Sequence, residues 1–331
     1  MKVEERFDPE LRGVAAWLPK LRLGPRMVGL VQRLRTVFSF RKDRVHDGVE
    51  RRWARAPRAD GGAVSLLVYR PVEEVGPRPA ILWLHGGGFV LGRPEDDDAH
   101  SLSLCKALGV VVVAPVYRLA PTHPYPAALY DALAALEWVH GSALELGLDP
   151  ERIAVGGRSA GAGLTAGLAL AARDLGGPSI AFQLLLYPML DDRTAEREAG
   201  DGRAYPLWSP ANNRFGWAAY LRTEDPSRAV SPYAAPARST SLAGLPRTWL
   251  GVGDQDLFHE EDLAYASRLK AEGVACGLHV AQGAFHAFDL VAPRATVSRR
   301  FAEAYRVDMA DALGVRLDRA PSPDELKRAA V

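Results

Sequence analysis

The chain has 331 residues, and its 41 Lys and Arg residues almost balance its 40 Asp and Glu residues, giving a formal net charge of +1. A hydrophobic content of 48% is enough for a large core and argues against disorder, while the near-neutral charge gives no whole-chain electrostatic case for nucleic-acid binding. Two cysteines, Cys105 and Cys276, are too few for a disulfide framework and favour a reducing, cytoplasmic compartment.

The first 50 residues carry apolar side chains at helical spacing, with several arginines between them. They contain early acids and no apolar segment typical of a signal peptide, and no stretch of the chain reaches the roughly 18 apolar residues of a membrane span. A basic amphipathic helix is compatible with a membrane surface, but we favour a helical cap packed on the main body. We therefore expect no stable membrane insertion.

From residue 63 onward, short β-branched stretches alternate with longer helical ones. The predicted strands are residues 64–69, 80–84, 110–114, 153–156, 182–186, 248–252 and 278–281. The predicted helices lie near residues 97–108, 124–140, 160–174, 260–272 and 294–312, and the acids Asp96, Asp97 and Asp98 fit a solvated helix start. This alternation predicts the α/β class, with a mostly parallel central sheet flanked by helices.

The expected domain organisation follows from where the alternation of predicted strands and helices begins, is interrupted and ends. We expect a core of residues 51–190 and 226–318, an N-terminal helical cap segment in residues 1–50, and a cap insertion in the aromatic-rich, loop-rich residues 191–225. Residues 319–331 form a polar tail.

The strongest local motif is Gly157-Arg158-Ser159-Ala160-Gly161, which follows a predicted strand and opens a predicted helix. This is a G-x-S-x-G nucleophile elbow in its strand–turn–helix context. A nucleophile on a sharp turn leaves room only for glycine two residues to either side, and the N–H groups at the helix start can face an oxyanion. The motif predicts Ser159 as a nucleophile.

A second motif, His85-Gly86-Gly87-Gly88-Phe89, stands at the end of another predicted strand. Successive glycines leave backbone N–H groups unobstructed, as donors to a developing alkoxide must be. Paired with the elbow downstream, this loop is interpreted as part of an oxyanion hole.

A serine nucleophile needs a base and an orienting acid, which in α/β-hydrolases follow in the order Ser, Asp or Glu, His. His286 lies in the loop after the last predicted strand, whereas His279 falls inside a strand and His259 at a helix start, so His286 is the expected base. Asp254 and Asp256 both follow a strand, and spacing alone leaves the choice between them open.

The chain resembles the hormone-sensitive-lipase family of α/β-hydrolase carboxylesterases over roughly residues 60–310. The matching blocks are His85–Gly88, Tyr117-Arg118-Leu119-Ala120-Pro121, the elbow Gly157–Gly161, and Ser231-Pro232-Tyr233. The resemblance implies the α/β-hydrolase fold with a helical cap and a triad of Ser159, Asp256 and His286, and so favours Asp256 over Asp254. It also implies oxyanion donors from Gly87, Gly88 and Ala160, motif support from His85, Gly86, Gly157 and Gly161, and a homodimer as a family-level guess.

Arg158 departs from the family pattern, which usually has Asp before the nucleophile; a cation there would alter substrate preference or pair with an acid on the lid. Candidate pocket residues are Phe89, Arg158, Tyr187, Leu207, Trp208, Phe215 and Trp217.

We therefore expect a serine carboxylesterase that hydrolyses short- to medium-chain acyl esters, with no metal and no organic cofactor. Amidase or lactonase activity on the same triad and a non-catalytic small-molecule-binding homologue are alternatives. A nucleotide-binding oxidoreductase is disfavoured, because the glycines after Gly161 fall inside the helix and do not open it.

Overall fold

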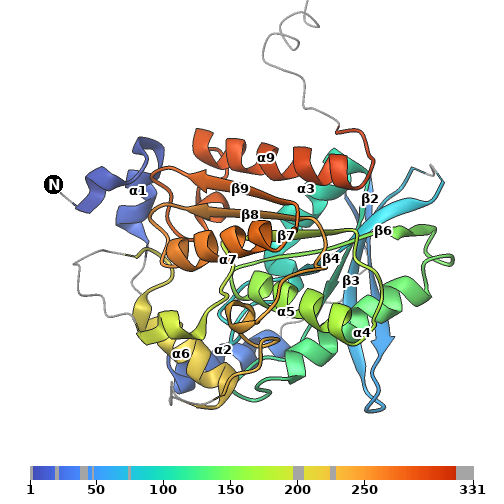
Figure 1. Cartoon of the computed structure of the whole chain (residues 1–331), viewed down its shortest axis with the longest axis horizontal. Coiled ribbons are helices and arrows are strands. Elements are labelled where there is room, and N and C mark those ends of the chain that lie inside the picture. The colour runs from blue at the N-terminus through green and yellow to red at the C-terminus, as the bar shows by residue number, and fades with distance from the viewer. Residues whose placement is uncertain are drawn as a thin grey trace, which may run out of the picture.

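The most apolar stretches of the sequence form the centre of a sheet in the computed structural model, which describes residues 3–18, 22–37, 44–46, 48–73, 76–196, 205–223 and 229–317. Within these residues, nine strands form one sheet in the order β1-β2-β3-β5-β4-β6-β7-β8-β9 (Figure 1). The strands are β1 (Arg44–His46), β2 (Val49–Pro57), β3 (Ala63–Pro71), β4 (Arg78–Leu84), β5 (Val111–Pro115), β6 (Leu148–Arg158), β7 (Phe182–Leu186), β8 (Thr248–Gly253) and β9 (Cys276–Ala281). From β5 to β9 all neighbours are parallel, and β1, β2 and β3 add an antiparallel edge.

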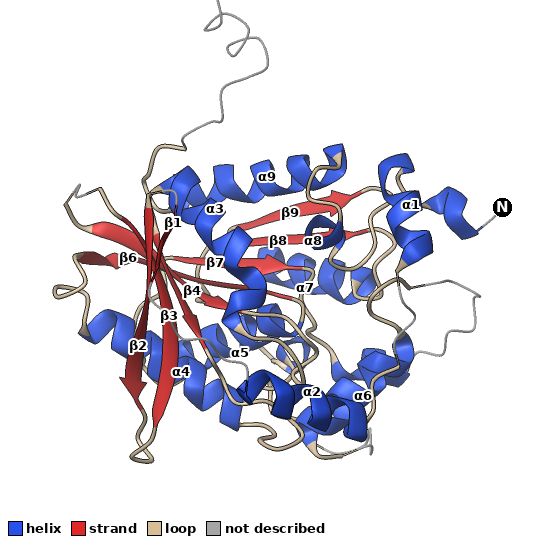
Figure 2. Cartoon of the chain, turned by 180° about the vertical axis from the view of Figure 1, so that it is seen from behind, coloured by secondary structure: helices blue, strands red, loops and turns tan. Residues whose placement is uncertain are grey.

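Helices cover both faces of this sheet (Figure 2). The α-helices are α1 (Pro9–Trp17), α2 (Pro25–Val37), α3 (Asp98–Leu108), α4 (Ala127–Gly141), α5 (Ala160–Asp174), α6 (Pro210–Leu221), α7 (His259–Ala271), α8 (Phe288–Val291) and α9 (Thr296–Ala312), and the short 3₁₀ helices are η1 (Val3–Arg6), η2 (Pro94–Asp97), η3 (Asp192–Glu196) and η4 (Pro236–Arg238). Apolar side chains of α4 and α5 pack on one face, together with α7, and those of α3 and α9 pack on the other. Burial on both faces explains why the central strands are continuous apolar stretches.

The α/β class and the mostly parallel sheet expected from the sequence are confirmed, and each predicted strand and helix overlaps an observed one. The strands β1 and β2 were missed. The expected boundary between residues 50 and 51 falls inside β2, so the sheet extends into the segment expected to be a helical cap. The expected tail, residues 319–331, and parts of both cap segments lie outside the described residues.

Helices from the two expected cap segments, α2 and α6, lie side by side (Figures 1 and 2). The Leu23 N–H, just before α2, donates to Asn212 Oδ1 in α6 at 2.9 Å. Gln32 Nε2 in α2 donates to the carbonyls of Val90 and Ala120 at 2.8 and 2.9 Å. These bonds attach α2 to α6 and to the loops that follow β4 and β5. No helix in the described ranges is both long enough and apolar enough to cross a membrane.

Candidate active site

The turn between β6 and α5 holds Ser159 in a strained backbone conformation, with φ 54° and ψ −126°. A β-carbon on Gly157 would lie 2.6 Å from the Gly161 carbonyl, and one on Gly161 would lie 2.1 Å from the Leu84 oxygen. Only glycine fits at both positions, as the elbow motif requires. The turn therefore fixes the Ser159 side chain at the carboxyl edge of the sheet.

Three side chains from separate loops meet at this edge in a continuous hydrogen-bonded chain. His286 Nε2 lies 2.9 Å from Ser159 Oγ, and His286 Nδ1 lies 2.8 Å from Asp256 Oδ2. The other carboxylate oxygen of Asp256 accepts from the Phe258 N–H at 3.0 Å. All three side chains are buried, so bulk water does not compete for these bonds.

The alternative residues considered in the sequence lie outside this chain of bonds. Asp254 Oδ1 accepts from the Gly283 N–H at 2.7 Å and so braces the loop that carries the imidazole. His279 lies within β9, where burial lowers its pKa, and His259 begins α7 with its ring nitrogen against Glu260. The geometry thus separates a carboxylate that contacts His286 from one that supports its loop.

The glycine loop after β4 lies beside Ser159 because β4 and β6 are neighbours in the sheet. Gly87 and Gly88 have φ values of 123° and 61°, and a β-carbon on Gly87 would lie 2.2 Å from the Leu91 oxygen. Over the described part of the chain, the N–H groups of Gly87, Gly88 and Ala160 donate to no protein acceptor. They are free to donate to an oxyanion.

His85, which opens the glycine loop, is held from one side by Tyr117. The two rings stack with their centroids 4.1 Å apart, and the Tyr117 hydroxyl donates to the His85 carbonyl at 2.6 Å. His85 Nδ1 lies 2.8 Å from the Gly86 carbonyl oxygen. These contacts hold the His85 ring against Tyr117 and the backbone of the glycine loop.

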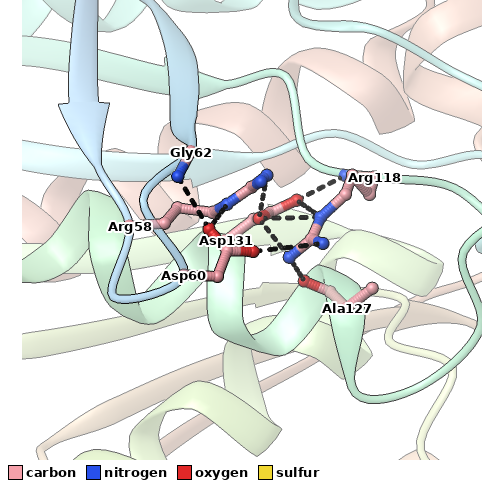
Figure 3. A network of polar contacts seen from close by, with 6 residues as sticks. All are labelled: Arg58, Asp60, Gly62, Arg118, Ala127 and Asp131. Carbon is pink, nitrogen blue, oxygen red and sulfur yellow. Dashed lines mark hydrogen bonds and ion pairs between the residues drawn. The ribbon is translucent and has the colours of Figure 1, made fainter.

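The loop carrying Tyr117 is itself anchored by a polar network around the buried Asp131 of α4 (Figure 3). Asp131 accepts from the Arg118 backbone N–H at 2.8 Å and from the Arg118 guanidinium at 2.8 to 3.1 Å. Arg58, from the turn between β2 and β3, adds a third contact at 3.3 Å. The missed strand β2 therefore contributes, through this turn, to the support of the glycine loop.

A cavity of about 310 Å³ opens beside Ser159. Of the candidate pocket residues, Arg158, Tyr187, Leu207 and Trp208 line it. Phe89, Phe215 and Trp217 do not: Phe89 and Trp217 are buried with their ring centroids 5.3 Å apart, and Phe215 packs against the same core cluster. Aromatic character alone does not separate a pocket wall from the core next to it.

Other lining residues were missed by sequence reasoning. Leu290 and Val291 line the cavity from α8, directly after the histidine loop, and their place downstream of His286 was the available signal. Asp97 also lines it; it is buried, so the expectation of a solvated acidic run is wrong at this position. Its carboxylate lies 3.3 Å from Arg158 Nε, so the ion-pair partner of Arg158 among the described residues comes from η2.

Tyr187 and Phe7 fix the histidine loop from two sides. The Tyr187 hydroxyl donates to Asp289 Oδ1 at 2.8 Å, and its ring meets the His286 ring edge-on at 5.0 Å. On the other side, the Phe7 ring meets Phe285 edge-on at 5.5 Å. The loop that carries the imidazole is thus packed by side chains outside the Ser159–His286–Asp256 relay.

Comparisons with known proteins cover most of the sequence. A family model described as alpha/beta hydrolase fold matches residues 81–290. Esterase LipI of Mycobacterium tuberculosis is 37% identical over 231 residues, which cover 69% of this chain and 71% of that protein. Carboxylesterase NlhH of the same organism is 35% identical over 241 residues, covering 70% of this chain and 74% of that protein.

Solved structures agree with these matches. A bacterial heroin esterase is similar with a TM-score of 0.83 and 39% sequence identity, over 94% of this chain and 99% of that one. Esterase LipW from Mycobacterium marinum has a TM-score of 0.81 and 37% identity, over 94% and 97% of the two chains.

Proposed function

The chain belongs to the α/β-hydrolase fold family, in its hormone-sensitive-lipase-like branch, and on that premise we propose that it cleaves short- to medium-chain acyl esters through Ser159, His286 and Asp256. It is a carboxylic ester hydrolase, the class that its relatives' names give. The observation that carries the proposed mechanism is the unbroken chain of bonds at 2.9 and 2.8 Å from hydroxyl to carboxylate.

In this mechanism His286 Nε2 takes the proton of Ser159 as Oγ attacks the ester carbonyl carbon. Asp256 accepts from Nδ1–H, which holds the required tautomer and stabilises the imidazolium. The oxyanion is bound by the N–H groups of Gly87, Gly88 and Ala160, each donor contributing about 10²- to 10³-fold in rate.

The imidazolium then protonates the leaving alcohol, and the acyl group stays on Ser159 Oγ. His286 Nε2 takes a proton from a water molecule as the water oxygen attacks the acyl-enzyme. The imidazolium then gives this proton to Ser159 Oγ as the acyl–oxygen bond breaks and the acid leaves. The steps need no group beyond the protein, the ester and water. The intact relay supports catalysis over the binding-only alternative, whereas amide and lactone cleavage stay predictions of the shared machinery.

The proposed chain-length preference rests on the cavity. A volume of about 310 Å³, with apolar walls from Leu207, Leu290 and Val291, suits a small acyl group. We also propose a division into core and cap in which α2 and α6 belong to the cap, whereas β1 and all of β2, including their residues before position 51, belong to the core. A cytoplasmic location and a homodimer stay predictions of the sequence.

The test is hydrolysis of p-nitrophenyl esters by the wild-type protein and by Ser159→Ala. We expect the wild type to act best on acyl chains of up to about six to eight carbons, and the variant to lose at least about 10³-fold in kcat. A rate near that of the wild type in Ser159→Ala would contradict the assignment of Ser159 as the nucleophile. A maximum at long chains would remove the chain-length proposal alone.

A further inference from the structure

One cation borders the candidate active site without an assigned role. Arg158 ends β6 immediately before the nucleophile, lines the cavity, and is only 2% exposed. It is directed alongside the glycine loop, because a β-carbon placed on Gly86 would lie 3.3 Å from Arg158 Cγ and 3.5 Å from Ser159 Cβ. Arg158 and the nucleophile Ser159 therefore line the same cavity.

Two of the three guanidinium nitrogens of Arg158 have no hydrogen-bond acceptor in the described part of the protein. Among the described residues, Arg158 Nε and Nη1 donate to no acceptor, although both atoms are fully buried. The closest carboxylate oxygen, Asp97 Oδ1, lies 3.3 Å from Nε outside hydrogen-bonding geometry, and Asp97 Oδ2 already accepts from Trp83 Nε1 at 2.7 Å. Buried donors without acceptors are costly, so a ligand acceptor that reaches Nε or Nη1 from the cavity gains hydrogen bonds that the protein does not supply.

The charges around Arg158 define which acceptor fits. Asp97 balances the guanidinium, and the carboxylate of Asp289 also interacts with it electrostatically. The exposed Asp96 adds another negative charge to the cavity wall. A carboxylate on the ligand would be repelled by these acids, whereas a neutral oxygen would accept the hydrogen bonds without that repulsion.

We propose that Arg158 is a specificity-determining residue, which selects esters carrying a neutral oxygen acceptor (an ether, carbonyl or hydroxyl oxygen) a few bonds from the scissile carbonyl. The inference rests on the proposed esterase function, because it assigns a second contact to the same substrate. It gives a role to the two guanidinium nitrogens that have no acceptor within the described protein.

The test compares substrates of equal length that differ by one CH₂-to-oxygen change. On the acyl side these are methyl pentanoate and methyl 3-methoxypropanoate, and on the alcohol side butyl acetate and 2-methoxyethyl acetate. Each ratio of kcat/KM is divided by the ratio of the hydroxide-catalysed rates, which removes the intrinsic reactivity of the esters. Monomethyl succinate supplies the anionic comparison.

The variants are Asp97→Asn and the double variant Arg158→Met with Asp97→Asn, which avoids leaving a buried carboxylate without its cation. Asn at 97 keeps an oxygen for Trp83 Nε1, so the two variants differ only in the guanidinium. The measured quantity is a ratio within each protein, so a general loss of activity or of folded protein cancels.

We expect the wild type and Asp97→Asn to prefer the ether by about tenfold in at least one pair, and the double variant to lose that preference. We expect monomethyl succinate to be poorer than methyl 3-methoxypropanoate for the wild type. Ratios near one in the wild type, a preference that survives removal of Arg158, or a preferred succinate would each overturn the inference. Failure of the wild type to cleave any of these esters would instead count against the proposed function.

Discussion

The two aspartates at the end of β8 differ in what they contact. Asp256 reaches His286 Nδ1, whereas Asp254 holds the Gly283 N–H of the loop that carries the imidazole. In Asp256→Asn the side chain has no negative charge to stabilise the imidazolium. It can also turn its NH₂ group toward Nδ1, which favours the wrong tautomer of His286. Asn at 254 still offers an oxygen to Gly283.

We therefore predict that Asp256→Asn lowers kcat on p-nitrophenyl butyrate by about 10³- to 10⁴-fold. The matched variant Asp254→Asn should lose less than about tenfold, because it keeps the hydrogen bond to the loop. Steady-state kinetics of the two variants measure the difference. Equal losses, or a larger loss at 254, would reverse the assignment of the acid.

Two further acids, Glu261 and Asp262, are buried in the first turn of α7. Glu261 accepts from the Leu190 and Asp191 N–H groups, yet burial raises its pKa to about 8. Neither oxygen of Asp262 has a hydrogen-bond partner within the described residues, and burial raises its pKa well above the usual range. The folded state thus holds protons that the unfolded chain releases near pH 4.

A pKa raised on folding makes stability highest at low pH and removes it as the pH rises through the folded-state value. We predict that Asp262→Asn has a shallower fall in the free energy of unfolding between about pH 4 and pH 8 than the wild type. Glu303→Gln, an exposed change of the same kind in α9, should leave the curve unchanged. Urea unfolding at several pH values measures this, and parallel curves for wild type and Asp262→Asn would contradict it.

At the residue scale, the sequence predicted the side chains that share a motif and missed those that meet only through folding. Ser159, Gly157 and Gly161 stand in one motif whose spacing reflects the turn itself. Arg158 and Asp97 come from different elements, 61 positions apart, and nothing in either local pattern indicates the other. Their burial depends on where η2 lies against the sheet.

Helix α1 and the residues before it form an element that acts on the histidine loop. The Asp8 N–H donates to the Gly283 carbonyl at 2.9 Å, and a β-carbon on Gly283 would lie 2.4 Å from Asp8 N. The Phe7 ring is buried against Phe285, next to His286. The N-terminal segment therefore covers the outer side of the loop that carries the base.

We predict that Phe7→Ala lowers kcat/KM for p-nitrophenyl butyrate by several-fold, because a Phe-to-Ala change costs about 3–5 kcal/mol in a buried site and loosens this short segment. Trp17→Ala is the matched control, since Trp17 lies in α1 but is 90% exposed. Kinetics of both variants decide the matter. If Phe7→Ala and Trp17→Ala behave alike, α1 does not position the loop.

Among the elements, the buried strands were predictable and the edge strands were not. Every residue of β4, β5 and β7 is buried, so each appears in the sequence as a short apolar stretch. β2 is mostly half-buried and contains Arg51, Arg52 and Arg55, which obscure any alternation. Its pairing with β3 is a tertiary contact that single-strand pattern reasoning does not contain.

At the scale of the whole molecule, the parallel sheet gathers the site. The loops after β4, β6, β8 and β9 all emerge at the carboxyl edge, and they carry the glycine loop, Ser159, Asp256 and His286. Ser159 and His286 are 127 positions apart, yet their side-chain atoms lie 2.9 Å from each other. The order of the strands, more than any single contact, makes this meeting possible.

The most direct measurement of the central claim is the site of covalent labelling by a fluorophosphonate, found by peptide mass spectrometry of the native protein. A serine activated by His286 displaces fluoride at phosphorus, forms the O–P bond, and gives one stable adduct per chain. We predict one adduct, on Ser159, which forms far more slowly in His286→Ala and is absent in Ser159→Ala. Labelling at another residue, or labelling of Ser159 that does not depend on His286, would contradict the proposed relay.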